Sequence, residues 1–314
     1  MRQVVHKNSW RVFLLAGIFA AALVAWPTAG LAANVPQPRL LTAGNYTVIG
    51  GSTITNTGST VITGNLALSP GTSVTGGPTV TGTSDIANAA ASQAQTDLVT
   101  TYNDAAGATC PATNNLTGKD LGGLTLTPGV YCFSTSAQLT GTLTLDGQGN
   151  TNPTFIFQIG SSLTTASASR VVLQNGAGAC AVFWQVTSSA TLGTTTSFQG
   201  NLITLASITM KTNATIGVGG GVNGGRALAR TSGAVTLDTN TITPPPASCT
   251  FTAAATPTPS PGGGAPAASP IPGNTGVPPQ LIGPFPWLLL IGLGAAGSAA
   301  ALGINRRRRR RSRV

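Results

Sequence analysis

Few residues in this chain could perform acid–base or metal chemistry. The single histidine, His6, lies in an N-terminal segment that we expect to be cleaved, and glutamate is absent. Histidine-based triads, His-Glu zinc motifs and the glutamate pairs of most glycosidases are therefore excluded. Six scattered carboxylates remain, at Asp85, Asp97, Asp104, Asp120, Asp146 and Asp238. A polysaccharide lyase would cluster such groups with arginine or lysine, so a lyase is kept only as an alternative, and we expect no enzyme, metal site or cofactor.

A glycine-rich stretch at residues 217–225 has the spacing of a dinucleotide-binding loop. Gly219, Gly221 and Gly224 fit the pattern GxGxxG. Such a loop binds phosphates where a strand precedes it and a helix follows, and the surrounding sequence predicts no such unit. We therefore expect a glycine-rich turn.

Threonine is the residue type whose pattern suggests a binding surface. Short runs alternate an aliphatic residue with threonine, serine or asparagine, as at residues 52–57, 139–145, 155–159 and 214–218. Alternation puts apolar groups on one face of a strand and hydroxyls on the other. Aligned on adjacent strands, threonines repeat at about 4.7–4.9 Å and make a flat, uncharged, half-apolar surface that can order water as in ice. The alternative is that threonine is simply a good exposed strand residue.

The elements that would carry these rows are many short strands and one helix. Closely spaced strands of small and β-branched residues favour a β-solenoid over a sandwich or a barrel. Residues 85–103 break the pattern, because they are rich in alanine and glutamine and have apolar residues four apart, at Ile86, Ala90, Ala94, Leu98 and Tyr102. They predict a helix of about 17 residues, capped by Ser84, that packs along the solenoid.

Four cysteines occur, at Cys110, Cys132, Cys180 and Cys249. In an exported chain we expect disulfides, and the sequence permits three pairings. We favour Cys110–Cys132, which would close the loop after the helix, with Cys180–Cys249 tethering the start of the C-terminal spacer. Zinc binding competes with this interpretation, but no CxxC spacing supports it.

The formal charge of +10 comes from the two ends of the chain. Residues 1–33 hold three basic side chains and residues 306–314 hold seven, and 3 + 7 gives the whole excess. Residues 34–250 hold six basic and six acidic side chains. A nucleic-acid-binding protein would cluster its basic residues on the folded part, so we expect no nucleic-acid partner.

Composition divides the chain into five parts. Residues 1–33 have a basic start, an apolar stretch and small residues at the end, which predict a signal peptide. Residues 34–250 are the solenoid domain, and residues 251–284 are a spacer rich in Pro, Gly and Ala. Residues 285–305 are apolar enough for a transmembrane helix, and the arginine-rich tail, 306–314, would stay in the cytoplasm. We expect an exported protein whose solenoid faces outward, anchored to the cell membrane or cell wall.

The order of spacer, span and basic tail resembles a Gram-positive cell-wall sorting signal, which carries Leu-Pro-x-Thr-Gly before the span. The nearest match here, at residues 271–276, has one residue too many between Pro272 and Thr275. Retention in the membrane is therefore at least as good an interpretation as attachment by a sortase.

Several stretches, in the same order, resemble the ice-binding-protein-like domain of bacteria and fungi. They include VFWQV at 182–186 and GRALAR at 225–230, and the others are residues 61–74, 94–98, 121–131 and 155–159. The resemblance covers residues 40–243. It implies a mostly β fold, a discontinuous β-solenoid with one long helix packed alongside, that contacts ice through one flat face.

The same resemblance suggests site residues. Some members carry Thr-(Ala/Gly)-x-(Thr/Asn) on the ice-contacting face, and two matches here predict ice contact by Thr42, Asn45, Thr57 and Thr60. The implied partner is an ice surface or ordered water, and the implied effect is limited crystal growth or attachment of the cell to ice. The alternative is a generic adhesin that binds glycans or another cell through an aromatic platform such as Trp184.

Overall fold

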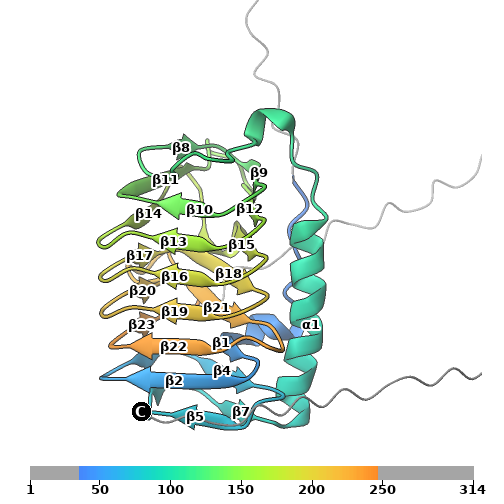
Figure 1. Ribbon diagram of the computed structural model, residues 1–314. Coiled ribbons are helices and arrows are strands. Elements are labelled where there is room, and N and C mark those ends of the chain that lie inside the picture. The colour runs from blue at the N-terminus through green and yellow to red at the C-terminus, as the bar shows by residue number, and fades with distance from the viewer. Residues whose placement is uncertain (1–34, 247–314) are drawn as a thin grey trace, which may run out of the picture. The chain divides into compact units, whose positions relative to one another are not determined.

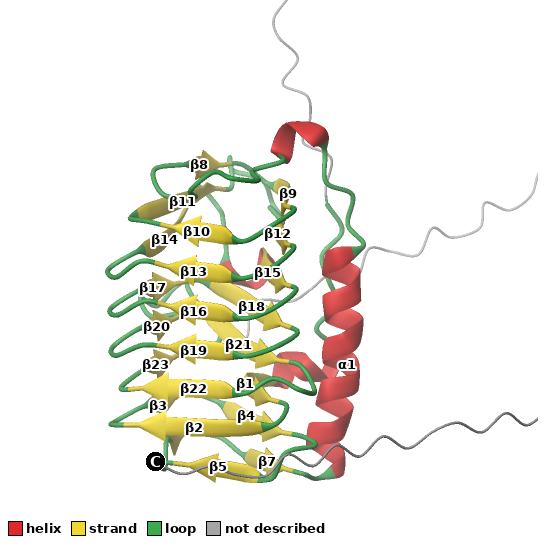
Figure 2. Ribbon diagram, viewed as in Figure 1, coloured by secondary structure: helices red, strands yellow, loops and turns green. Residues whose placement is uncertain are grey.

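A computed structural model describes residues 35–246 of the chain. The expected signal peptide, spacer, transmembrane helix and arginine-rich tail lie outside the described residues, as does Cys249. The described chain is mostly β-structure, with three parallel sheets and one long α-helix (Figure 2). None of its helices is both long enough and apolar enough to cross a membrane.

Three sheets form the sides of a solenoid (Figure 1). Sheet A has eight strands in the order β7 (Ser84–Ile86), β4 (Asn65–Leu68), β1 (Tyr46–Gly50), β21 (Gly225–Ala229), β18 (Gly200–Thr204), β15 (Val182–Val186), β12 (Phe155–Ile159) and β9 (Gly129–Phe133). Sheet B has seven strands in the order β10 (Ala137–Leu139), β13 (Leu163–Thr165), β16 (Ala190–Leu192), β19 (Ile208–Met210), β22 (Val235–Asp238), β2 (Thr53–Thr57) and β5 (Ser73–Thr75). Sheet C has eight strands in the order β6 (Thr79–Val80), β3 (Val61–Ile62), β23 (Thr241–Ile242), β20 (Thr215–Ile216), β17 (Ser197–Phe198), β14 (Arg170–Gln174), β11 (Thr142–Asp146) and β8 (Thr125–Leu126).

The coils do not follow one another in chain order. Strands β1 to β7 build one end of the solenoid, helix α1 (Ala89–Ala106) runs along it to the other end, and β8 to β23 wind back (Figure 1). The last coil then inserts beside the first, so that β21 pairs with β1, β22 with β2 and β23 with β3. This insertion confirms the discontinuous solenoid that the family resemblance implied.

The interior is a column of apolar side chains contributed by all three sheets. Every coil sends residues such as Ile54, Leu192 and Ile216 inward, and these are fully buried. Near one end, aromatic rings stack across coils: the ring centroids of Phe157 and Trp184 are 3.9 Å apart. This continuous core explains how two- and three-residue strands are stable, since each coil buries its apolar residues against its neighbours.

Turns of neighbouring coils approach each other closely where glycine stands. A Cβ added at Gly71 would lie 1.8 Å from the carbonyl oxygen of Ser52, and one added at Gly51 would lie 2.0 Å from that of Arg230. A side chain at either position would push the stacked coils apart. Glycine at these turns therefore sets the spacing of the coils.

Helix α1 covers the outer face of sheet A. Its buried residues include Ala94, Leu98 and Tyr102, which pack against outward-facing residues of the sheet such as Ile156 and Phe183. Sheet A is consequently buried on both faces, and β12, β15, β18 and β21 lose the alternation of apolar and polar residues that the sequence led us to expect. The position of the helix along the solenoid is as predicted.

The start of the helix differs from the prediction. Residues 84–86 form strand β7, and the helix begins at Ala89 with Asn88 as its cap, the Asn88 side chain accepting a hydrogen bond from the amide of Ala91 at 2.9 Å. Ser84 is therefore not the cap, because β7 pairs with β4 before the chain turns into the helix. Of the expected apolar stripe, Ile86 lies before the helix and is 39% exposed.

Three 3-10 turns complete the described elements, η1 (Leu41–Asn45), η2 (Ala112–Asn114) and η3 (Ala179–Ala181). The alternating run at residues 139–145 is not one strand, because Leu139 ends β10 and Thr142 begins β11 around a corner of the solenoid. Thr140, Gly141 and Thr142 are all exposed at the corner, and the apolar residues Leu139 and Leu143 on either side of it are buried. The run at residues 214–218 likewise shortens to β20.

Candidate functional site

The outer face of sheet B carries an aligned row of threonines, one from each of six neighbouring strands. The strand register places them directly opposite one another, with Gln138 at one end, in the order Gln138, Thr164, Thr191, Thr209, Thr236, Thr55 and Thr75. We call these six threonines the threonine column. Neighbouring strands are about 4.7–4.9 Å apart, so the hydroxyl and methyl groups repeat at that interval along the solenoid.

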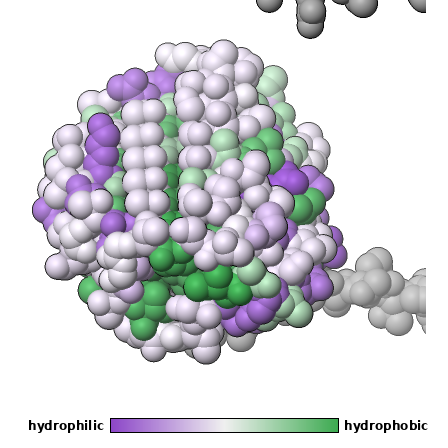
Figure 3. Space-filling model, turned by 60° about the horizontal axis from the view of Figure 1, so that its bottom comes forward, coloured by the Kyte–Doolittle hydropathy of each residue, from purple (hydrophilic) through white to green (hydrophobic). Residues whose placement is uncertain are grey.

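A second row runs parallel to the threonine column, two residues earlier in each coil, at or just before the start of the strand. Its members are small and mostly hydroxylic, namely Ser136, Ser162, Ser189, Ser207, Ala234, Thr53 and Ser73. The register pairs Thr53 with Ser73, and the hydroxyls of Ser136 and Ser162 are 3.0 Å apart. Figure 3 shows pale columns of this kind running along the solenoid. The face therefore has order in two directions, along the strands and across them.

The threonine column rests on a fully packed layer. Its neighbours along each strand point inward, and residues such as Leu163, Ile208 and Val235 are fully buried. Within the described chain, none of the six hydroxyls bonds another protein group, so all six are available to water. The strands are held by the core beneath them and the hydroxyls face solvent, which makes the array both rigid and hydratable.

Charged groups lie at one edge of this face and not within the column. A hollow of about 340 Å³ at one edge is lined by Thr209, Thr236, Lys211 and Asp238, among others. The carboxylate of Asp238 accepts hydrogen bonds from the hydroxyls of Thr212 and Thr239. The six threonines of the column, and Gln138 at the end of the row, are thus uncharged.

Sheet C presents a less regular surface. Its central outward row pairs Thr79, Val61, Thr241, Thr215, Ser197, Arg170 and Thr142 in register. Arg170 and Val61 interrupt the hydroxyls, and six of the eight strands are two residues long. The sequence is rich in threonine on both faces, but the unbroken column occurs on sheet B.

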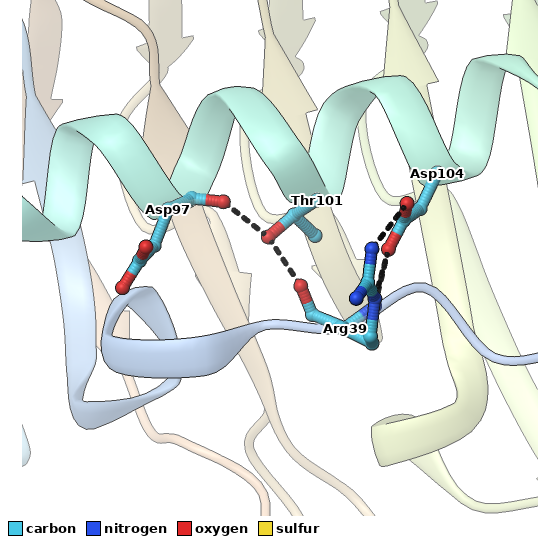
Figure 4. Close-up of polar contacts among 4 residues, drawn as sticks. All are labelled: Arg39, Asp97, Thr101 and Asp104. Atoms are coloured by element: carbon cyan, nitrogen blue, oxygen red, sulfur yellow. Dashed lines mark hydrogen bonds and ion pairs between the residues drawn. The ribbon is translucent and has the colours of Figure 1, made fainter. Parts of the chain in front are cut away.

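Two of the aspartates that we weighed as catalytic fasten the N-terminal segment to helix α1 instead. Asp104 receives hydrogen bonds from Arg39, with Nε and an oxygen 2.9 Å apart (Figure 4). Asp97 receives them from the amide and hydroxyl of Thr42. The hydroxyl of Thr101 lies 2.8 Å from the carbonyl oxygen of Arg39. These contacts hold residues 39–42 against the helix, so the carboxylates have structural partners.

Hydrogen bonding makes these carboxyl groups more acidic. The hydrogen bond from Arg39 lowers the pKa of Asp104, and the one from Asn88 lowers the pKa of Asp85. Burial raises the pKa of Asp97, but its hydrogen bonds outweigh burial and the net pKa is lowered. All three groups are therefore ionised at neutral pH. An ionised carboxylate suits a structural ion pair or hydrogen-bond acceptor, whereas a general acid must be protonated.

The remaining aspartates are equally dispersed. Asp120 accepts hydrogen bonds from the amides of Gly122 and Thr140, and Asp146 accepts one from the amide of Gln148. Among residues 35–246, no three histidine, cysteine or acidic side chains come together in a way that could hold a metal ion. The glycines at 217–225 connect β20 to β21 as a loop, with no helix following them.

The four site residues suggested by the family motif do not lie together. Thr42 and Asn45 belong to η1, beside the helix, and Thr57 ends β2 on the same face as Thr55. Thr60 is 1% exposed, and its hydroxyl accepts a hydrogen bond from the amide of Asn240 at 3.0 Å. The motif did not identify the threonine column, because a local motif cannot show which threonines align on neighbouring strands. The sequence pattern that points to the column is a repeated triplet of two inward residues with a threonine between them, at residues 163–165, 190–192 and 208–210.

The remaining predictions concern the disulfide pairings and Trp184. The Cys110–Cys132 disulfide is present, as predicted, and ties the segment after the helix to β9. The expected Cys180–Cys249 pair includes a residue outside the described range. Trp184 is fully buried, stacks on Phe157 and donates a hydrogen bond from Nε1 to the carbonyl oxygen of Gln199 at 2.9 Å. It belongs to the core and cannot serve as a glycan-binding platform.

Fold and surface together define a class: a discontinuous, three-sided β-solenoid with a helix on one side and an uncharged hydroxylic array on another. Comparison with known proteins gives the family. The ice-binding-like family model matches residues 48–243, and the chain belongs to that family.

Individual relatives support the assignment. An ice-binding protein of Nostoc sp. (strain HG1) is 50% identical over 224 residues, covering 71% of this chain and 79% of that protein. One of Flavobacterium frigoris (strain PS1) is 38% identical, over 48% of this chain and 50% of its own length. Among solved structures, an ice-binding protein from an Antarctic biological consortium superposes with a TM-score of 0.60 at 46% identity, over 65% of this chain and 90% of that one. Another, from the Antarctic ascomycete Antarctomyces psychrotrophicus, gives 0.61 at 36% identity, over 67% and 99%.

Proposed function

We propose that the protein binds ice through the outer face of sheet B, with the threonine column as the centre of the contact. The observation that carries the proposal is the register of six threonines on six adjacent strands. Membership of the ice-binding-like family and relatives named as ice-binding proteins support it.

The mechanism follows from the chemistry of the array. Each threonine offers a hydroxyl that hydrogen-bonds water and a methyl group that does not, so the face can hold water in repeating positions without binding any molecule tightly. The absence of charge within the column matters, because an ion orders its hydration shell around itself and not along a lattice. Water ordered at the spacing of the strands then merges with a growing crystal face, and the adsorbed protein limits further growth.

A steric probe on each face tests the proposal. Thr209→Tyr puts a large side chain in the middle of the threonine column, and Thr142→Tyr puts the same side chain on the exposed outer face of sheet C. The wild-type protein and Thr142→Tyr are expected to shape ice crystals and to show thermal hysteresis, whereas Thr209→Tyr loses most of both. Circular dichroism establishes that each variant is folded. A folded wild-type protein that leaves ice growth unchanged would refute the proposal.

We further propose that the protein works at the cell surface, limiting ice growth there or attaching the cell to ice. This rests on the sequence at the two ends: a signal peptide at residues 1–33, an apolar span at 285–305 and a basic tail at 306–314. Cell fractionation tests it. The full chain should sediment with membranes or wall and be cleaved by protease added to intact cells, whereas recovery in the culture medium would contradict anchoring.

A further inference from the structure

The threonine column crosses a junction between two parts of the chain that are far apart in sequence. Thr55 and Thr75 come from the N-terminal coils, and Thr236 comes from the last coil. We call the three strand pairs at this junction, β1–β21, β2–β22 and β3–β23, the seam. Elsewhere, neighbouring coils follow one another along the chain, so the length of each turn limits their register. At the seam no short connection does so.

Apolar patterning alone leaves the register of the seam incompletely determined. A slip of one residue would turn Ile54 out of the core, and the lost burial forbids it. A slip of two residues keeps inward residues inward. It would, however, set Thr236 opposite Thr53 or Thr57 in place of Thr55, and the threonine column would be offset in its middle. Some other interaction must therefore exclude the two-residue slip.

Buried polar side chains bridge the seam in sheet A at both ends of its strands. At the start of β21, the guanidinium of Arg226, 8% exposed, donates to the carbonyl oxygen of Gly44 and to Oδ1 of Asn201, both at 2.9 Å. At the end of the strands, Gln95 of helix α1 donates from Nε2 to the carbonyl oxygens of Gly50 at 2.9 Å and Ala229 at 3.1 Å. Each side chain thus bonds groups on both sides of the seam.

A third bridge lies at the corner between sheets B and C. The hydroxyl of Thr60 accepts a hydrogen bond from the amide of Asn240, and both residues are 1% exposed. The Asn240 side chain donates in turn to the carbonyl oxygens of Lys211 and Ala214, each at 2.9 Å. Thr60 immediately precedes β3 and Asn240 immediately precedes β23, so this bond fixes how the two strands enter sheet C.

We propose that Arg226, Gln95 and the Thr60–Asn240 pair are positioning residues that set the register of the seam and so join the two parts of the threonine column into one lattice. The bonds that cross the seam are specific to one alignment, because a slip by two residues separates Arg226 from Gly44, Gln95 from Ala229 and Asn240 from Thr60. It would deprive a buried guanidinium, a buried side-chain amide and a buried backbone amide of one hydrogen bond each, and unpaired polar groups are strongly disfavoured away from water. Directional polar contacts of this kind are best suited to specifying register. The inference about ice rests on the proposed function; the inference about register does not.

Engineered disulfides measure the register directly. In the native alignment, Thr55→Cys and Thr236→Cys lie on directly paired positions, within reach of a disulfide, whereas Thr53→Cys or Thr57→Cys with Thr236→Cys lie on diagonal positions about 7–8 Å apart. We expect the first pair to crosslink and the diagonal pairs to stay open. With Gln95→Leu, Arg226→Met or Thr60→Val added, a diagonal pair should crosslink at the expense of the direct pair.

Ice activity per folded molecule gives the second readout. Leu145→Ala, in the core far from the seam along the solenoid, is the control for lost stability alone. We expect the seam variants to lose several-fold more hysteresis than this control at an equal fall in melting temperature. If Arg226→Met does not fold, Thr60→Val, which removes one acceptor, carries the test. Native crosslinking and full activity in folded Gln95→Leu and Thr60→Val would overturn the proposal. A wild-type protein that crosslinks in the native register but shows no ice activity would overturn the proposed function and leave the inference about register standing.

Discussion

Sheets B and C are wound from the same coils and cover the same core, yet their outer faces differ. Threonine fills six of the seven central positions of sheet B, whereas Val61, Ser197 and Arg170 interrupt the corresponding row of sheet C. The strands of sheet B have three to five residues, and most of those in sheet C have two. Abundant threonine is therefore not enough to make a regular array; sheet B adds an unbroken alignment across strands and a greater width along them.

The largest expected effects come from cavities beneath the two faces. Phe198→Ala, under sheet C, should lower the free energy of unfolding by about 3–5 kcal/mol, and Ile208→Ala, under sheet B, by about 2–5 kcal/mol. Both side chains are fully buried. Chemical denaturation followed by circular dichroism measures the loss. Below the unfolding transition, Phe198→Ala should keep its ice activity and Ile208→Ala should lose part of it, because the second cavity lets β19 shift; the opposite order would contradict the assignment of the binding face.

Giving sheet B the interruption of sheet C should have the next largest effect. Thr164→Arg introduces a charged side chain into the threonine column, much as Arg170 occupies the row of sheet C. We expect adsorption to ice to weaken about tenfold, which corresponds to about 1.4 kcal/mol. Binding of a fluorescently labelled protein to a growing ice crystal measures this, with Thr142→Arg on sheet C as the matched control. Equal losses in the two variants would mean that net charge, and not the column, is responsible.

Repairing sheet C should have a smaller effect. Val61→Thr combined with Arg170→Thr completes a hydroxylic row on sheet C. Adding Thr209→Tyr removes most of the ice activity of sheet B, so that the activity of sheet C can be measured. We expect this triple variant to recover a minor part of the hysteresis lost in Thr209→Tyr, since two-residue strands support a single row and sheet B supports two. Recovery of full activity would show that one aligned row is sufficient.

A change of pH should affect stability and leave the binding face unchanged. The pKa values of Asp85, Asp97 and Asp104 are lowered in the fold, below the value of about 3.9 for an unperturbed aspartate. A lowered folded pKa stabilises the protein above the unfolded value and ceases to do so as pH falls through the folded pKa. Urea titrations should therefore show stability falling below about pH 4. Hysteresis measured between about pH 5 and about pH 9 should be constant, because the column has no titrating group.

A mutation separates the acid effect from the rest of the fold. Asp104→Asn removes the ion pair with Arg39, so the variant should be less stable at neutral pH and lose less stability on acidification. Its hysteresis per folded molecule should equal that of the wild type. An acid profile identical to that of the wild type would mean that the ion pair between Arg39 and Asp104 does not govern acid stability.

Much of the fold was predictable from particular residues. Short alternating runs predicted the parallel solenoid strands, and the alanine-rich segment with Leu98 and Tyr102 four apart predicted a helix along them. The Cys110–Cys132 disulfide followed from the loop after that helix. The helix start was wrong by four residues because Ser84 and Asn88 are both good caps, and pairing of β7 with β4 decided between them.

The sequence predicted a threonine-rich solenoid face but not which threonines align across the strands. The motif-based choice of Thr42, Asn45, Thr57 and Thr60 stays a prediction; these residues do not lie together, and of the four Thr57 lies on the outer face of sheet B. Thr42 satisfies Asp97 and Thr60 satisfies Asn240. Whether a threonine faces water, caps a turn or bridges two coils depends on which strand comes to lie beside it, and a motif of four residues contains no such information.

The sequence by itself determined the periodicity, the neutrality of the middle of the chain and the supply of threonine, because these are local properties of composition and alternation. Only the tertiary structure decided which threonines form one row. Thr209 and Thr236 are separated by one coil along the sequence, whereas Thr236 and Thr55 are separated by most of the domain, and both pairs are neighbours in the column. The physical reason is that a strand pattern of period two specifies which face a residue occupies but not its partner on the next strand. That partner is chosen by turn lengths within a coil and, where the chain closes on itself, by directional hydrogen bonds from buried polar side chains.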